Sequence, residues 1–452
     1  MDRRTFLEGS AAAGGLLIGA RAFSPGDGVV EAAASPLVAQ ATRGTSPLVI
    51  TGVQTIVIRA PRDNSTPEGP LAVNPLGTTT GGPGIWNRLD MASPSRFNGV
   101  EQAVLVKITT DQGLIGWGEC HAPAAPRMQA TIIQDLFRPQ LIGQDARQVQ
   151  ALWHRLYASE RVRGYSTGAH LEALAGVDIA LWDILGKFVG VPVSRLLGGT
   201  FRDRIPTYAT FSGTYTNKDK GQPVVDRAQA MVASGFTALK LALRKGPDSD
   251  ELATVRVIAE AVRDKAQIAV DALGAFSLNE AVRMGKELDR IGNIAWFEDA
   301  LVPDDLPRYP ELAEAVDTAI CAGEMLSTRY QFRDLLIDRG ADMVNPDMGR
   351  AGGITEMRRI SWIADVYGAL WAPHVSTGSA PYMAASMHLA VSSPNCPMME
   401  IYDGNKQDGP FGNRLLKEPL DIKPGWATPP DRPGLGVDFD PAALAAVTVE
   451  TR

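Results

Sequence analysis

The sequence predicts an α/β fold in which a (β/α) barrel follows a smaller α+β domain. Two observations support this prediction. From Ile205 onward, short apolar runs alternate with blocks of helical periodicity, a pattern that is typical of parallel βαβ units. The apolar runs also end at ionisable residues spaced 23 to 31 residues apart, about one strand and one helix each. These seven ends are Lys240, Asp271, Glu298, Glu324, Asp347, His374 and Glu400.

Length and composition limit the possible classes of protein. A chain of 452 residues can form a barrel and a further domain. Hydrophobic residues make up 45% and charged residues 21%, as in soluble globular proteins, and no internal apolar run is long enough for a stable membrane span. The net charge of −7 argues against nucleic acid as a partner. Three scattered cysteines form neither a disulfide framework nor a Cys-x-x-Cys zinc site.

The N-terminus has the composition of a leader. Arg3 and Arg4 precede a run of small and apolar residues that continues to Ala20, and a second small-residue cluster follows at residues 32–34. This arrangement resembles a twin-arginine export signal, so we expect residues 1–46 to direct export to the periplasm. A disordered, alanine-rich leader with a chance arginine pair is the alternative.

The first folded segment, residues 47–170, is predicted to be a small α+β domain. β-branched apolar residues at 49–58 indicate a strand, and residues 102–109 and 115–119 indicate a hairpin with a turn at Gly113. Helical periodicity follows over residues 129–157 and again over 170–187, where Gly190 and Pro192 end it.

Between the first two strands, residues 61–98 are rich in Pro, Gly, Thr and Asn. A loop of this length in a compact domain is usually functional or disordered. We predict a flexible cover over an active site, in which Trp86 contacts the substrate. Packing on the surface explains Trp86 equally well.

Three of the strand ends predict a metal site. Because the carboxyl ends of consecutive barrel strands converge on one pocket, Asp271, Glu298 and Glu324 are expected to lie close together. These residues offer only carboxylate oxygens, the ligands that suit Mg²⁺, whereas zinc would normally recruit His or Cys. The cation would polarise a substrate carboxylate and acidify the neighbouring C–H.

The later strand ends supply a base. His374 is the candidate, with Asp347 one strand earlier as the carboxylate that fixes its tautomer and raises its basicity. Lys240 would contribute positive charge toward the substrate carboxylate or its enediolate. Glu400 would either donate a hydrogen bond to the substrate, if protonated, or be a spectator.

Several short motifs, taken together in this order, resemble the enolase superfamily and within it the mandelate racemase/muconate lactonizing branch. The resemblance covers about residues 48–430. It implies a modified TIM (β/α) barrel at residues 171–405, an N-terminal α+β capping domain at 47–170, and a segment at 406–452 that packs back on the capping domain. It also implies Mg²⁺, abstraction of the proton α to a carboxylate, and a homo-oligomer. The motifs are residues 174–183 (LAGVDIALWD), 235–240 (GFTALK), 296–299 (WFED), 322–324 (AGE), 345–347 (NPD), 352–355 (GGIT) and 373–374 (PH).

Two departures from the family pattern narrow the expected reaction. Many members carry a second lysine two residues after the one that corresponds to Lys240, and this chain has Ala242 there. Many members also carry Asn or His two residues after the aspartate that binds the metal, and this chain has Leu273 there. His374 and Asp347 are then the only proton-transfer pair, and one base on one face fits a syn β-elimination. The resemblance therefore implies a sugar-acid dehydratase that forms a 2-keto-3-deoxy acid. Arg163, in the loop at 160–170, is a further candidate for substrate binding.

Two alternatives remain at this point. One is a racemase or epimerase with a second base from the loop at residues 161–165. The other is a non-catalytic sugar-acid binding protein that has kept the carboxylates, with Ala242 and Leu273 as signs of lost activity.

Overall fold

A computed structural model describes residues 46–61, 100–123, 125–211, 218–243, 246, 249–375, 378–402 and 411–452. Residues 47–452 form one compact unit. Residues 1–45 of the expected leader, and the expected cover loop with Trp86, lie outside the described residues. In the described part of the chain, no helix is both long and apolar enough to cross a membrane.

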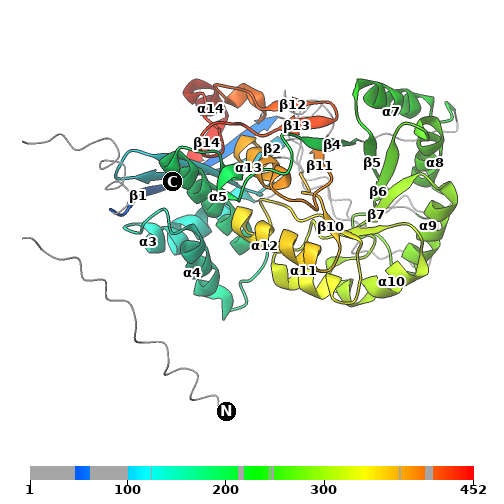
Figure 1. Cartoon of the computed structure of the whole chain (residues 1–452), viewed down its shortest axis with the longest axis horizontal. Coiled ribbons are helices and arrows are strands. Elements are labelled where there is room, and N and C mark those ends of the chain that lie inside the picture. The colour runs from blue at the N-terminus through cyan, green and yellow to red at the C-terminus, as the bar shows by residue number, and fades with distance from the viewer. Residues whose placement is uncertain are drawn as a thin grey trace, which may run out of the picture. The chain divides into compact units, whose positions relative to one another are not determined.

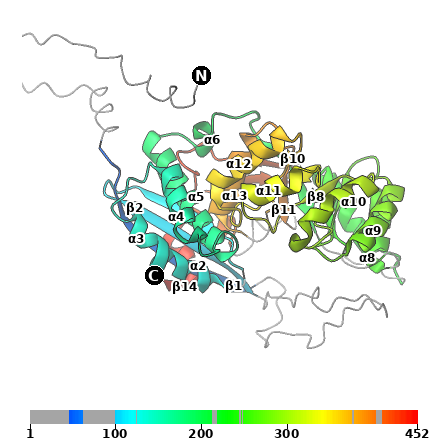
Figure 2. The ribbon, with the colours of Figure 1, turned by 90° about the horizontal axis from the view of Figure 1, so that it is seen from below.

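The N-terminal domain contains a four-stranded antiparallel sheet with the strand order β14-β1-β2-β3. The predicted hairpin is present, since β2 pairs with β3 and Gly113 adopts a φ of 77° in the turn between them. Helices lie along one side of this sheet, and α4 and α5 are seen beside β2 in Figure 2. The strands are β1 (Ile50–Pro61), β2 (Val100–Thr110), β3 (Ile115–Cys120) and β14 (Thr448–Thr451).

The helical region after β3 differs from the expected continuous helix over residues 129–157. The chain leaves the helical conformation at residues 142–148, where Gly143 has a φ of 82°. The predicted helix after it is present as α5, which ends at Gly190 in the left-handed conformation. The helices of this domain are α2 (Pro126–Ile132), the π-helix η1 (Ile133–Phe137), α3 (Arg138–Leu141), α4 (Val149–Arg161), α5 (Ala169–Val189) and α6 (Val193–Leu196).

The predicted barrel is present as a run of eight parallel strands, from β11 through β4 to β10. The two ends of this run approach each other where the Glu400 N–H donates to the carbonyl of Pro373 at 3.4 Å. The strands are β4 (Ile205–Thr210), β5 (Ala238–Ala242), β6 (Gln267–Asp271), β7 (Ile294–Glu298), β8 (Ile320–Ala322), β9 (Met343–Val344), β10 (Leu370–Trp371) and β11 (Met399–Tyr402).

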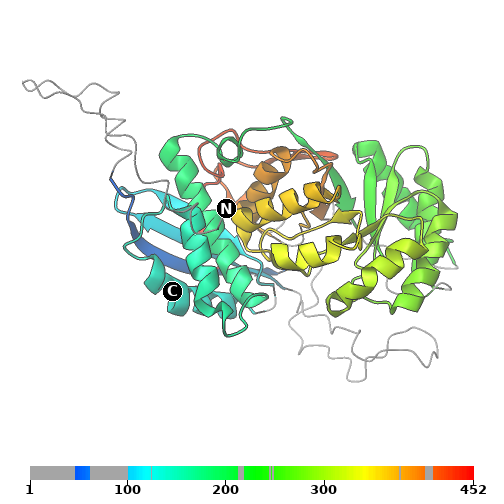
Figure 3. The same cartoon turned by 60° about the horizontal axis from the view of Figure 1, so that its bottom comes forward.

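Each of the first seven barrel strands is followed by a helix, and Figure 3 shows these helices outside the strands. Among the described elements, β11 is followed by the short η4 (Asn413–Leu415) in place of a long helix. The barrel helices are α7 (Gln222–Ser234), α8 (Asp250–Val262), α9 (Leu278–Ile291), the 3₁₀ helix η2 (Pro303–Arg308) with α10 (Tyr309–Ala315), α11 (Arg329–Leu336), α12 (Gly353–Val366) and α13 (Ala380–Val391).

The C-terminal segment contacts both parts of the fold. β12 (Asp421–Lys423) and β13 (Trp426–Thr428) form a hairpin that pairs with barrel strand β4. Farther along, α14 (Pro441–Val447) leads to β14, which pairs with β1 beside the C-terminus in Figure 1. Residues 406–452 were expected to pack on the capping domain. In the structure β14 does so, whereas β12 and β13 extend the barrel sheet.

Helix α5 joins the two parts. One of its faces packs on β3 and another packs on α12. Between α5 and α12, the buried carboxylate of Asp178 accepts the Thr355 N–H at 2.9 Å and the Thr355 hydroxyl at 2.6 Å. The expected domain boundary after residue 170 cuts this helix in its first turn, so α5 belongs with the sheet that it covers.

Candidate active site

Three carboxylates converge at the carboxyl ends of neighbouring barrel strands. Asp271 is the last residue of β6, Glu298 is the last residue of β7, and Glu324 follows β8 by two residues. Each is buried, and each offers an oxygen within 4.8 Å of the others'. The predicted convergence is therefore present, because the parallel strands bring their ends to one edge of the barrel.

Each of these carboxylates has a neighbour with positive φ. Leu273 follows Asp271 by two residues with a φ of 50°, Asp299 follows Glu298 with a φ of 39°, and Gly323 precedes Glu324 with a φ of 133°. The Leu273 N–H donates to Asp271 at 2.9 Å, and the Gly323 N–H donates to Asp299 at 3.0 Å. Backbone strain of this kind clusters at functional sites, where it aims particular groups.

The strain at Leu273 leads to a test of stability. Asparagine tolerates the left-handed conformation better than leucine, and the Leu273 side chain is 44% exposed, so little packing is lost. We expect Leu273→Asn to raise the free energy of unfolding by about 1 kcal/mol, measured by denaturant titration. Leu370→Asn is the matched control, since Leu370 is 47% exposed and lies in a strand. If Leu273→Asn gained no free energy of unfolding relative to Leu370→Asn, the backbone at Leu273 would not be strained.

Lys240 lies among the carboxylates. Its ammonium group is 2.5 Å from Glu298, 3.1 Å from Asp271 and 3.2 Å from Glu400, and the side chain is buried. Burial opposes the charge, but these three acids outweigh it and hold the pKa of Lys240 well above its usual range. The lysine therefore neutralises and orients the cluster.

Glu400 is held by donors on both oxygens. Thr210 and Lys240 contact Oε1, while the Val375 N–H donates to Oε2 at 2.9 Å. Proton donation from Glu400 to the substrate stays a prediction. In the structure Glu400 accepts hydrogen bonds on both oxygens and connects Lys240 with the region of His374, whose Nε2 is 3.7 Å from Oε2.

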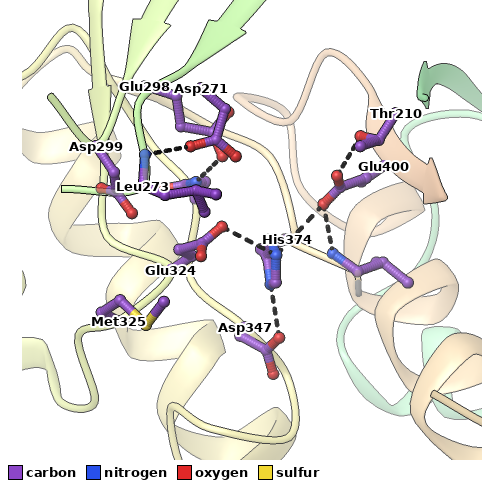
Figure 4. A network of polar contacts seen from close by, with 12 residues as sticks. Thr210, Asp271, Leu273, Glu298, Asp299, Glu324, Met325, Asp347, His374 and Glu400 are labelled. Atoms are coloured by element: carbon purple, nitrogen blue, oxygen red, sulfur yellow. Dashed lines mark hydrogen bonds and ion pairs between the residues drawn. The ribbon is translucent and has the colours of Figure 1, made fainter. Parts of the chain in front are cut away.

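The predicted pair of His374 and Asp347 is also formed. Nδ1 of His374 is 2.7 Å from Oδ2 of Asp347, and Nε2 lies 3.0 Å from Oε2 of Glu324. Figure 4 shows Glu324, Asp347 and Glu400 around the imidazole of His374. Burial opposes the charged ring, but Glu324, Glu400 and Asp347 together raise the pKa of His374 well above its usual range. One nitrogen is thus fixed by Asp347, and the other faces the carboxylate cluster.

The cluster fits a divalent cation that prefers oxygen ligands. Burial, together with the charges of Asp271, Glu324 and Glu400, raises the pKa of Glu298 to about 8 despite the opposing charge of Lys240. Buried carboxylates at this spacing repel one another, and a cation between them removes both the repulsion and much of the cost of burial. Asp271, Glu298 and Glu324 match the hard-oxygen donor set of Mg²⁺.

Of the two further predicted substrate contacts, Arg163 lies away from this cluster and the contact through Trp86 stays a prediction. Trp86 lies outside the described residues. Arg163 follows α4, its side chain is 74% exposed, and its ion pair is with Glu160 at 3.6 Å. The structure therefore places Arg163 on the surface, in contact with a residue of the preceding helix.

Sequence reasoning did not find three residues that contact the base or its partners. The Tyr382 hydroxyl donates to Asp347 at 2.7 Å, Thr210 contacts Glu400, and Nδ1 of His121 is 3.9 Å from Asp347. His121 directly follows β3 of the N-terminal domain, so no spacing within the barrel series points to it. Thr210 was findable in principle, because it ends the first barrel strand.

Comparisons with known proteins agree with this architecture. Residues 223–443 match the family model described as "Enolase C-terminal domain-like", and residues 89–198 match the "Mandelate racemase / muconate lactonizing enzyme, N-terminal domain". The N-terminal match includes α5, in agreement with its packing.

Relatives match over most of their length. The chain is 35% identical over 348 residues to D-galactarolactone cycloisomerase of Agrobacterium fabrum, covering 75% of this chain and 90% of that protein. It is 31% identical over 335 residues to arabinonate dehydratase of Saccharolobus solfataricus, covering 74% and 87%. A crystal structure of an enolase superfamily member from Agrobacterium tumefaciens superposes with a TM-score of 0.77 at 26% identity, covering 89% of this chain and all of that one. The chain therefore belongs to the mandelate racemase/muconate lactonizing enzyme family of the enolase superfamily.

Proposed function

We propose that the protein is a Mg²⁺-dependent dehydratase of a sugar acid, an aldonate or an aldarate. The observation that carries this proposal is the His374–Asp347 pair, in which Asp347 holds Nδ1 of His374 while Nε2 lies 3.0 Å from Glu324 of the three-carboxylate cluster. Ala242 and Leu273 stand at the positions where many family members carry a further base or polar group. A single base suits an elimination in which one group handles both proton transfers.

Asp271, Glu298 and Glu324 would hold the cation. When bound, Mg²⁺ would polarise the substrate carboxylate and so acidify the C–H beside it. Lys240 keeps the carboxylates in place through its contacts with Glu298 and Asp271.

His374 carries the proton chemistry. Its Nε2 takes the proton from the carbon next to the substrate carboxylate, and Asp347 stabilises the imidazolium through Nδ1. The imidazolium then returns this proton to the β-hydroxyl on the same face. The C–O bond breaks, water leaves, and the resulting enol tautomerises to a 2-keto-3-deoxy acid.

The named relatives favour this chemistry and also raise a second candidate. Arabinonate dehydratase and D-galactonate dehydratase of Verminephrobacter eiseniae are similar to this chain at 31% and 32% identity. D-Galactarolactone cycloisomerase, at 35% identity, favours cycloisomerisation of a sugar-acid lactone. The same proton abstraction would serve both reactions. If the leaving group is an oxygen of the lactone ring, it remains part of the same molecule when its C–O bond breaks, and the product is an isomer of the substrate.

A panel of aldonates, aldarates and their lactones, incubated with the full-length protein and Mg²⁺, tests the proposal. We expect at least one open-chain acid to form a keto acid with the loss of one water, measured by mass spectrometry. A product of unchanged mass from a lactone would support the cycloisomerase in its place. No turnover on any member, with Mg²⁺ binding retained, would favour the non-catalytic binding protein.

A further inference from the structure

Asp347 receives a second hydrogen bond on the oxygen that contacts the base. The Tyr382 hydroxyl donates to Oδ2 at 2.7 Å, the oxygen that lies 2.7 Å from Nδ1 of His374. The same hydroxyl is 3.0 Å from the backbone carbonyl of His374. The Gly349 N–H donates to the other oxygen, Oδ1, at 2.8 Å. All of these groups are buried, so the orientation of the Asp347 carboxylate depends on these donors.

Tyr382 is placed by the N-terminal domain. Glu119 of β3 accepts hydrogen bonds from the Ser379 N–H at 2.8 and 2.9 Å and from the Ser379 hydroxyl at 2.6 Å. A longer bond of 3.4 Å comes from the Tyr382 N–H. These donors form the start of α13, which is the helix that carries Tyr382. A buried carboxylate at a helix N-terminus satisfies N–H groups that would otherwise lack partners.

Asp347 has a competing partner close by. Nδ1 of His121 lies 3.9 Å from Oδ2 of Asp347, and His121 belongs to the same segment as Glu119. Both histidines therefore face the same oxygen of Asp347, with His374 the nearer at 2.7 Å. The Tyr382 hydroxyl donates its one proton to that oxygen at 2.7 Å, and therefore helps to hold it against Nδ1 of His374.

We infer that Tyr382 is a positioning residue for the base, and that Glu119 sets its place from the capping domain through the start of α13. This inference rests on the proposed function of His374. It assigns to the capping domain a part in aligning the proton-transfer pair, in addition to covering the barrel.

Kinetics of Tyr382→Phe test the inference. The change keeps the ring and removes only the hydroxyl. We expect kcat to fall by at least about tenfold, with KM within about threefold, because a slightly misaligned base slows proton transfer more than binding. Ser386→Ala is the matched control: its hydroxyl is buried on the same helix, donates to the Tyr382 carbonyl at 3.0 Å and does not contact Asp347. Equal effects of the two variants on kcat would overturn the inference.

A second measurement needs no substrate. The proton on Nδ1 of His374, bonded to Asp347, should give a strongly downfield NMR resonance that is absent from His374→Asn. We expect this resonance to move upfield or disappear in Tyr382→Phe and to stay in place in Ser386→Ala. A resonance unchanged in Tyr382→Phe would refute the positioning role. If His374→Asn stays active, the proposed function fails; if it is inactive while Tyr382→Phe has normal kcat, only this inference fails.

Glu119 is tested through coupling. Glu119→Gln keeps the size of the side chain but places an amide where Ser379 donates. We expect it to lower kcat, and the double variant with Tyr382→Phe to lose less than the product of the two single losses. Independent effects that multiply would show that Glu119 does not act through Tyr382.

Discussion

His374→Asn is expected to lower kcat by at least about 100-fold, because a general base contributes roughly 10² to 10⁴ in rate. Asparagine can approximate the hydrogen bond to Asp347 but cannot take up the proton. Affinity for Mg²⁺ should fall by no more than the roughly 10- to 100-fold that the loss of an outer-shell partner costs, because His374 is not one of the three clustered carboxylates although its Nε2 lies 3.0 Å from Glu324. Steady-state kinetics and calorimetric Mg²⁺ titration measure the two effects.

His154→Asn provides the control for this variant. His154 lies on α4 with its side chain exposed, so the same chemical change there should leave both kcat and Mg²⁺ affinity unchanged. Activity of His374→Asn within about tenfold of the unsubstituted protein would contradict the mechanism, since such a loss is below the general-base range.

Glu298→Gln should weaken Mg²⁺ binding by at least about 100-fold, since losing even an outer-shell partner of a ligand costs 10- to 100-fold. The amide has one oxygen in place of two and carries no charge. Glu298 also accepts the Trp296 indole N–H at 2.8 Å and the Asn345 amide at 2.8 Å, which hold it in its present orientation. Turnover should fall with occupancy of the cation site and recover in part at high Mg²⁺.

Glu311→Gln is the matched control for the metal titration. The Glu311 side chain is 63% exposed and pairs loosely with Arg308 at 3.7 Å, so its loss should leave Mg²⁺ affinity unchanged. If Glu298→Gln bound Mg²⁺ as tightly as the unsubstituted protein, Glu298 would not be a ligand of the metal.

The barrel and the carboxylate cluster could be predicted from sequence for one physical reason. Parallel strands buried on both sides appear as short apolar runs, and the first polar residue after such a run marks the edge where the strands converge. Asp271, Glu298, Glu324 and His374 follow this rule, whereas Asp347 comes two residues after Asn345, the first polar residue that follows its run. The pattern is local along the chain, so it is visible without knowledge of the packing.

Contacts between the two parts of the fold could not be predicted in this way. Glu119 and Ser379 are 260 residues apart, and Tyr382 follows His374 by eight, which matches no strand spacing. Arg163 was chosen for its charge and its loop, but its contact with Glu160 depends on local geometry. The helix expected over residues 129–157 was wrong at residues 142–148, because its apolar periodicity continued through a segment that turns at Gly143.

The central claim is that one base, His374, removes the α proton and returns it to the leaving group on the same face. Running the reaction in D₂O and examining both product and unreacted substrate tests it most directly. We expect loss of water, a keto-acid product that has gained deuterium at the carbon next to the keto group, and recovered substrate of unchanged configuration. Recovered substrate that carries α-deuterium with inverted configuration would require a second base on the opposite face and would contradict the claim.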